Sequence, residues 1–197
     1  MKWADVPWSM ALATAPAVEP LTYAEAKLWL RLPDDTDETL VTSLIAEARA
    51  KVEQDTGLRL ITQAWDVSGD AFPEDGICLP VEPLLSVTSL KVTSVAGVQS
   101  TVASTVYQVD TAHSPPRILL ADGQSWPSDI RLAQGIVARV SVGYGAAKSA
   151  IPGPLINACR QLVSMWYTAS RMGQGVLPPK WAGYDDAIAP YRRRGIA

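Results

Sequence analysis

The sequence predicts an α+β protein: a helical core, made of a helix pair and a C-terminal helix, with an inserted, mainly antiparallel β domain and extended terminal arms. Two stretches, residues 37–57 and 152–172, repeat apolar residues at the spacing of an amphipathic helix. Between them, residues 62–145 break into short apolar runs separated by proline, glycine and aspartate. No helical segment separates these runs, which favours hairpins over parallel crossovers.

The same pattern divides the chain into five segments. We expect an N-terminal arm at residues 1–20, a first part of the helical core at 21–61, a β-rich insertion at 62–145, a second part of the core at 146–175 and a C-terminal docking arm at 176–197.

Residues 37–57 are predicted to form the central helix. The apolar side chains that share one face of it are Leu40, Val41, Leu44, Ile45, Ala48 and Val52. The acidic run Asp34, Asp35, Thr36 and Asp37 offers side-chain oxygens to the unpaired N–H groups at its start. Gly57 suits the left-handed conformation that ends a helix.

A shorter helix is expected just before it. Thr22 and Glu25 have the spacing of a capping box, and Pro33 stops the helix. We expect Ala24, Leu28 and Leu32 to pack inward. The acidic turn that follows is short, so the two helices should lie side by side as an antiparallel pair.

The insertion contains six candidate strands: residues 62–67, 77–79, 87–95, 107–110, 117–120 and 136–144. The last has the clearest pattern, because apolar residues alternate from Ile136 to Tyr144 as on a strand with one buried face. Ala96–Gly97 and Ser114–Pro116 are predicted turns.

Helical periodicity returns at Pro152, and Pro152 and Pro154 suit the first turn of a helix. The predicted inward stripe is Leu155, Ile156, Cys159, Leu162, Val163, Trp166 and Tyr167. It is expected to close against Leu40, Leu44 and Val52 of the central helix, and Gly173 and Gly175 are expected to end it.

Composition narrows the function classes. The 197 residues are 48% hydrophobic, with a net charge of −3 that draws no nucleic acid to the chain as a whole. Cys78 and Cys159 form neither a disulfide framework nor a metal cluster. No apolar run approaches the ~20 residues of a membrane span. Asp5, Pro7 and Pro16 interrupt the N-terminal apolar run, which favours an extended arm over a secretion signal.

Candidate catalytic motifs are few. His113 is the single histidine, and a dyad with the adjacent Ser114 needs a geometry that neighbouring residues seldom reach. The acidic run at residues 34–38 lacks the spacing of a calcium loop, and Gly143–Gly145 lacks the lysine of a phosphate loop. We therefore expect no enzyme activity, no cofactor and no metal.

The C-terminal segment is the candidate interaction site. Trp181, Tyr184, Ile188 and Tyr191 are large side chains in a proline-flanked tail too short to build its own core. They either dock on another protein or pack on their own domain. The basic end Arg192, Arg193 and Arg194 can pair with acidic groups of a partner, contact DNA phosphates or remain solvated.

Several fragments together resemble a known family. They are LTYAEAKLWLRL at residues 21–32, TG at 56–57, TQAW at 62–65, ICLPVEPLLSVTSL at 77–90, YQVD at 107–110, WP at 126–127, GYG at 143–145, IPGPLINACRQLVSMWYTASR at 151–171, VLPPKW at 176–181 and PYRRR at 190–194. In this order they resemble phage head-tail connectors of the gp6-like superfamily, in particular its large phage gp8-like group, which includes adaptors of gene transfer agents.

The resemblance implies a structural protein of a virion or phage-like particle, located at the head-tail interface and assembled in the cytoplasm of the bacterial host. Such a connector forms a ring of twelve copies beneath the portal protein. It extends the channel through which DNA passes without sequence-specific binding, and it carries head-closure or tail proteins.

Within this hypothesis, helices 37–56 and 154–172 form the ring, and the β insertion is peripheral or tail-facing. Residues 181–194 are the candidate portal-docking arm, so deletion of residues 180–197 should abolish portal attachment. Two alternatives remain: a nucleic-acid-binding module that uses the arginine tail, and a hydrolase that uses His113, Ser114 and a distant carboxylate.

Overall fold

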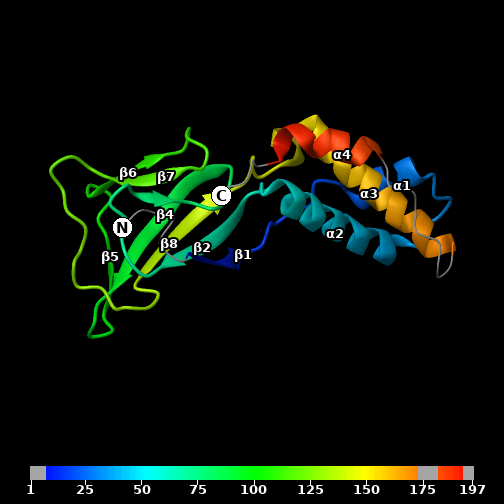
Figure 1. Cartoon of the computed structure of the whole chain (residues 1–197). Coiled ribbons are helices and arrows are strands. Elements are labelled where there is room, and N and C mark those ends of the chain that lie inside the picture. Colours follow the sequence, from blue (N-terminus) through cyan, green and yellow to red (C-terminus); the bar gives the residue numbers. More distant parts are fainter. Residues whose placement is uncertain (1–7, 173–181, 193–197) are drawn as a thin grey trace. The chain divides into compact units, whose positions relative to one another are not determined.

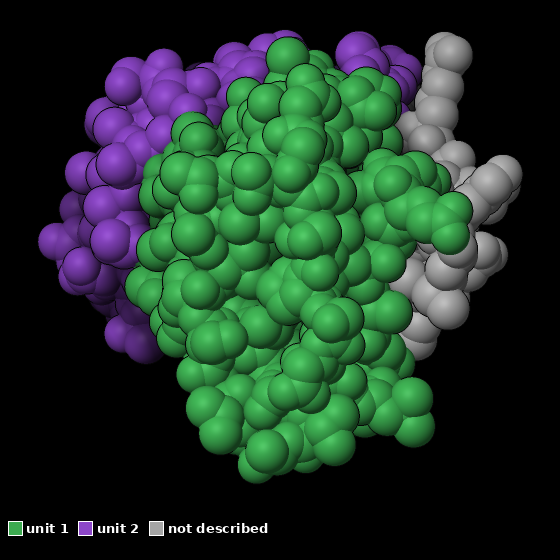
Figure 2. All heavy atoms as spheres, turned by 90° about the vertical axis from the view of Figure 1, so that its left-hand side faces the viewer, with its two compact units in different colours: residues 1–16, 62–143 green, residues 17–61, 144–197 purple. Residues whose placement is uncertain are grey.

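The computed structural model describes residues 8–172 and 182–192, and these form two compact units. The first unit is made of residues 1–16 and 62–143, and the second of residues 17–61 and 144–197. Figure 1 shows the strands in the first unit and the helices in the second, and Figure 2 colours the two units separately. The α+β class with antiparallel sheets inserted between helices is confirmed.

Five strands of the first unit form one antiparallel sheet in the order β1-β2-β8-β4-β5. Their bounds are β1 Ser9–Thr14, β2 Gln63–Gly69, β4 Leu84–Thr93, β5 Gln99–Thr101 and β8 Ile136–Val142. Strand β8 lies in the centre and alternates buried and more exposed residues, as its sequence predicted.

The remaining strands of this unit form a second antiparallel sheet in the order β3-β7-β6, with β3 Ile77–Cys78, β6 Tyr107–Asp110 and β7 Arg117–Leu120. One hydrophobic cluster contains buried residues of both sheets, including Val67, Leu90 and Val140 of the first and Ile77 and Ile118 of the second. The β unit therefore has a core of its own.

Two strands were not predicted. β1, in the expected N-terminal arm, pairs with β2 from Ser9 opposite Ser68 to Thr14 opposite Ala64. Its residues are all exposed, so the sequence carries no alternation to reveal it. The three-residue strand β5 follows the predicted turn at Ala96–Gly97, where Gly97 has a φ of 81°.

The helical unit contains α1 Tyr23–Leu30, α2 Glu38–Thr56, α3 Gly153–Met172 and α4 Ala182–Ile188, with short 3-10 turns η2 Lys148–Ala150 and η3 Ala189–Tyr191. Helices α2 and α3 run antiparallel, because Asp37 at the start of α2 accepts a hydrogen bond from Tyr167 near the end of α3 at 2.5 Å. In the part of the chain that the structure describes, no helix is long and apolar enough to cross a membrane.

The predicted helix ends are confirmed in two places and corrected in a third. Thr22 and Glu25 form the capping box of α1, and Gly57 ends α2 with a φ of 75°. Asp37 precedes α2 but makes no capping hydrogen bond, since its carboxylate is engaged by Tyr167 and Arg171 of α3. Asp37 thus fixes α3 to the start of α2 instead of capping the helix.

The face that α1 turns inward also differs from the prediction. Of the three predicted residues, only Leu32 packs on the core, whereas Ala24 is exposed and Leu28 is 81% exposed. The residues that α1 turns inward are instead the buried Ala26 and the partly buried Tyr23 and Leu30. The helix ends at Leu30, because Arg31 takes a left-handed conformation with a φ of 56° before Pro33 is reached.

Along α2 and α3 the predicted stripes are buried apart from Leu40, which is 37% exposed, and Trp166, which is half-buried. Leu40 lies in the first turn of α2, next to the fully buried Val41.

Glu53 fixes the exit of the chain from α2. Its side chain is 8% exposed, its Oε1 accepts a hydrogen bond from the backbone N–H of Leu60 at 2.9 Å, and its Oε2 accepts one from Arg49 at 3.3 Å. Leu60 is fully buried, so this N–H has no access to water.

Replacing Glu53 by alanine should destabilise the helical unit by about 1–3 kcal/mol, because the buried N–H of Leu60 loses its acceptor. Urea unfolding followed by far-ultraviolet circular dichroism measures the change. Glu47→Ala is the matched control, since Glu47 is exposed on the same helix and its loss should cost less than about 0.5 kcal/mol. Equal effects of the two substitutions would contradict the assigned role of Glu53.

Candidate docking surface

Helix α4 and the turn η3 form the described part of the predicted docking arm. Ile188 is fully buried in the core of the helical unit, and Tyr191 packs partly against it. The hydroxyl of Tyr184 donates a hydrogen bond to Asp55 Oδ2 at 2.7 Å. Gly183 lies so close to α3 that an added Cβ would be 3.3 Å from Gln161 Oε1. The arm is therefore anchored on its own unit by one apolar side chain and one hydrogen bond.

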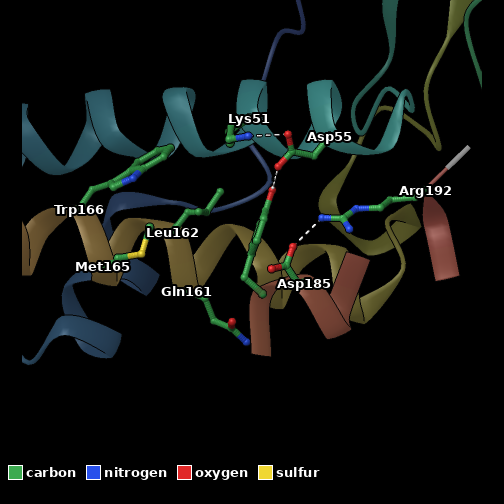
Figure 3. Close-up of a pocket in the computed structure, with 9 residues that line it drawn as sticks. Lys51, Asp55, Gln161, Leu162, Met165, Trp166, Asp185 and Arg192 are labelled. Carbon is green, nitrogen blue, oxygen red and sulfur yellow. Dashed lines mark hydrogen bonds and ion pairs between the residues drawn. The ribbon is translucent and has the colours of Figure 1, made fainter. Parts of the chain in front are cut away.

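A pocket of about 480 Å³ lies beside this anchor, between α2, α3 and α4 (Figure 3). Its lining consists of Lys51, Asp55, Gln161, Leu162, Met165, Trp166, Tyr184, Asp185 and Arg192. The apolar side chains come from α3, and the charged groups come from α2, α4 and the residue after η3. An apolar floor with a charged rim is typical of a site that holds a large side chain or a small molecule.

The charges of the rim form pairs. Lys51 Nζ lies 2.5 Å from Asp55 Oδ1, and Arg192 Nη2 lies 2.5 Å from Asp185 Oδ1, as the dashed lines in Figure 3 mark. Burial alone would raise the pKa of Asp55, but the hydrogen bonds from Lys51 and Tyr184 outweigh it and the pKa is lowered. Burial and the bond to Asp55 raise the pKa of the Tyr184 hydroxyl, which remains a donor at neutral pH.

The structure brings four of the seven predicted arm residues to this region. Tyr184 and Arg192 line the pocket, Ile188 lies in the core beneath it, and Tyr191 is half-buried beside that core. Trp181, Arg193 and Arg194 lie outside the described residues, as do the expected helix-ending Gly173 and Gly175.

The pocket itself was not predicted from the sequence. Trp166 was placed in the inward stripe of α3 together with Tyr167, although adjacent helix residues point about 100° apart. Tyr167 is buried and Trp166 is only half-buried, so Trp166 reaches the pocket. Lys51 and Asp55 line the pocket only because Tyr184 of α4 contacts Asp55. These two residues are 129 positions apart, so local sequence patterns do not reveal their contact.

The hydrolase alternative finds no support in the geometry around His113. The His113 ring Nδ1 lies 2.8 Å from the backbone oxygen of Pro115, while the Ser114 hydroxyl donates to Glu82 Oε1 at 3.0 Å. The two side chains thus have different partners, and the Ser114 hydroxyl is not hydrogen-bonded to the His113 ring that this alternative assigned as its base.

The acidic run before α2 does not gather ligands for a cation. Asp34 accepts from the N–H of Thr36, Asp35 from Lys27 and Asp37 from Tyr167. The hydrogen bond from Tyr167, with the guanidinium of Arg171, holds the pKa of Asp37 below its usual range. Among residues 8–172 and 182–192, no group of three or more potential ligands is placed to hold a metal ion.

Three solved structures share this fold over nearly the whole chain. One is a chain from the neck of an empty gene transfer agent particle computed with C6 symmetry, with a TM-score of 0.76, 24% identity and coverage of 96% of this chain and 97% of that chain. Another is from the virion of a native gene transfer agent particle, with a TM-score of 0.75, 24% identity and coverage of 95% and 97%.

The third is from the neck of a native particle computed with C12 symmetry, with a TM-score of 0.74, 25% identity and coverage of 96% and 97%. Among curated proteins, no sequence matches the chain.

These comparisons relate the chain to structural components of phage-like particles. Residues 21–115 match the phage gp6-like head-tail connector protein family. The resemblance carried by the helix pair and the strand motifs is thereby confirmed, whereas membership of the narrower gp8-like group remains a prediction.

We expect Tyr184→Phe to destabilise the helical unit by about 1 kcal/mol at neutral pH, because Asp55 loses a hydrogen bond. The lowered pKa of Asp55 means that its contribution is complete above the ordinary carboxyl value of about 3.9 and is lost as the pH falls through the folded-state value. Urea unfolding at several pH values should therefore show the difference from wild type shrinking below about pH 4.

Tyr191→Phe is the control, since Tyr191 is half-buried on the same segment and the described residues offer its hydroxyl no partner. A difference between wild type and Tyr184→Phe that stays constant down to low pH would contradict the link to Asp55.

Proposed function

We propose that this chain is an adaptor-type head-tail connector that forms a ring, of twelve copies, under the portal protein of a tailed phage or phage-like particle. The supporting observation is the match of residues 21–115 to the gp6-like connector family, combined with a fold shared over 96% of the chain with a protein from a neck computed with C12 symmetry. The proposed location is the neck of such a particle, after synthesis in the cytoplasm of the bacterial host.

The two units have different proposed tasks. The helical unit, with α2 and α3 at its centre, forms the ring, and the β unit is peripheral or faces the tail, where it carries head-closure or tail proteins. Separate hydrophobic clusters favour this division, because each unit keeps its own core while one of them engages a partner.

Residues 181–194 are the proposed portal-docking arm. Ile188 and Tyr184 are committed to their own unit, so contact with the portal is assigned to Tyr191, Arg192 and the residues that follow. The deletion of residues 180–197 suggested by the sequence would also remove the fully buried Ile188. Removal of residues 193–197 alone is a sharper test because it leaves this anchor in place.

DNA is proposed to pass through the ring without being held. A net charge of −3 favours sliding, since proteins that hold DNA neutralise its phosphates with many basic side chains. The second candidate function, a nucleic-acid-binding module, relies on the arginine tail. Arg192 is already paired with Asp185, which weakens that candidate.

Native mass spectrometry of the chain, with and without the portal protein encoded beside it, tests the proposal. We expect copies to add to the portal as a complete ring, because a platform that presents identical sites in a closed arrangement favours closure. A chain that ignores the portal, or that occupies it irregularly, would contradict the connector function.

The truncated chain lacking residues 193–197 should lose portal attachment and keep its melting temperature, while a chain lacking residues 1–7 should keep both. Retained attachment of the first variant would contradict the docking-arm assignment. Salt-sensitive binding to DNA by the free chain would instead favour the nucleic-acid-binding module.

A further inference from the structure

The helical unit presents two unlike features on opposite sides of the α2-α3 pair. On α3, the Arg160 guanidinium lies 5.7 Å from the centre of the Trp29 ring of α1, whereas Leu162 lines the pocket. Residues two positions apart on a helix are separated by about 200° around its axis. Helix α1 and the pocket therefore lie on nearly opposite sides of α3.

Helix α2 gives the same result independently. Arg49 pairs with Glu19, in the segment that leads into α1, at 2.7 Å, whereas Lys51 lines the pocket. These residues are again two positions apart, so they point to nearly opposite sides of α2. The α2-α3 pair is thus a layer with α1 on one side and the pocket with α4 on the other.

Helix α1 carries two adjacent, exposed large apolar side chains, which we name the α1 knob: Leu28, 81% exposed, and Trp29, 53% exposed. Isolated exposed apolar residues are common, but tryptophan is enriched among the residues that dominate the binding energy of interfaces, and Leu28 extends the apolar surface beside Trp29. Both side chains remain exposed to this extent with all described neighbours in place.

The pocket has the properties of a receptor for such an anchor. Leu162, Met165 and Trp166 supply apolar surface, and about 480 Å³ is space enough for an indole ring and a neighbouring aliphatic group. Trp166 also offers an aromatic partner to Trp29, and aromatic pairs add about 0.5–1.5 kcal/mol to the burial of their area.

The charges around the two features are complementary. Exposed Arg31 and half-buried Arg160 flank the knob. Among the described residues at the pocket, the pairs Lys51–Asp55 and Arg192–Asp185 balance, and the exposed Asp186 that follows on α4 adds one negative charge. Opposite charges of this kind orient two surfaces and reject like-charged partners.

We propose that the α1 knob of one copy occupies the pocket of the next copy, and that this contact is the repeating interface of the ring. The inference rests on the proposed ring. Because knob and pocket lie on opposite sides of the layer, a copy engages one neighbour with each, which produces a head-to-tail chain and not a two-fold dimer. Because the two contact faces are nearly opposite, each copy is rotated only slightly relative to its neighbour. A ring built in this way closes only after many copies.

The test uses the full chain assembled on its portal, with Leu28→Cys and Met165→Cys combined in one variant and a short bismaleimide as the cross-linker. Cys78 and Cys159 are buried, so the wild-type chain gives the background. We expect a ladder of cross-linked multimers that ends at the size of the closed ring. The matched control is Leu132→Cys with Met165→Cys, since Leu132 is 92% exposed in the β unit and should give no ladder.

A second pair of variants measures the contribution of the knob. Leu28→Asp should leave the melting temperature unchanged, because this side chain is exposed, and should lower ring occupancy on the portal at least tenfold. Leu132→Asp, at a still more exposed position of the other unit, should assemble like wild type.

The outcomes separate this inference from the proposed function. Rings that form without the ladder, or that tolerate Leu28→Asp, overturn the interface while the connector function stands. A cross-link from the Met165→Cys position to the portal, or to another segment of the same chain, identifies a different occupant of the pocket and also overturns it. Failure of the wild-type chain to form a ring overturns the proposed function itself.

Discussion

The packing of α2 against α3 is the contact on which the helical unit depends. Val41, Ala48 and Val52 of α2 and Leu155 and Cys159 of α3 are all fully buried in one cluster. Each larger side chain contributes roughly 1.5–3 kcal/mol when it leaves water, and the small ones allow close approach of the helices. The pair forms a layer that supports α1 on one side and α4 on the other.

Carboxylates of α2 and of Asp37, the residue before it, hold the neighbouring segments in place around this layer. Asp37 binds the end of α3, Glu53 binds the backbone of Leu60 where the chain leaves for the β unit, and Asp55 binds Tyr184 of α4. One helix thus carries both the apolar stripe of the core and the acceptors that place its neighbours. The pocket exists because Asp55 and Ile188 hold α4 beside Trp166.

Long helices and local signals were predictable from the sequence, and tertiary partners were not. The stripes of α2 and α3 extend over five turns or so, and the capping box of α1 depends on residues three apart. An eight-residue helix has only about two turns, so its inward face was assigned wrongly and Leu28 was thought to be buried. Asp37 was expected to cap α2 because it directly precedes the helix. Its actual partner, Tyr167, is 130 residues away and cannot be found from local spacing.

Leu28, which was predicted to pack inward, is the central residue of the proposed contact between copies. Leu28 is apolar, exposed and opposite a pocket, as a head-to-tail ring requires. A reconstruction of the particle neck at side-chain resolution tests this most directly. The account predicts a ring of this chain below the portal, with Leu28 and Trp29 of each copy inserted between α2 and α3 of the next. Density for this chain elsewhere in the particle, or a ring whose pockets are empty or filled by another protein, would contradict it.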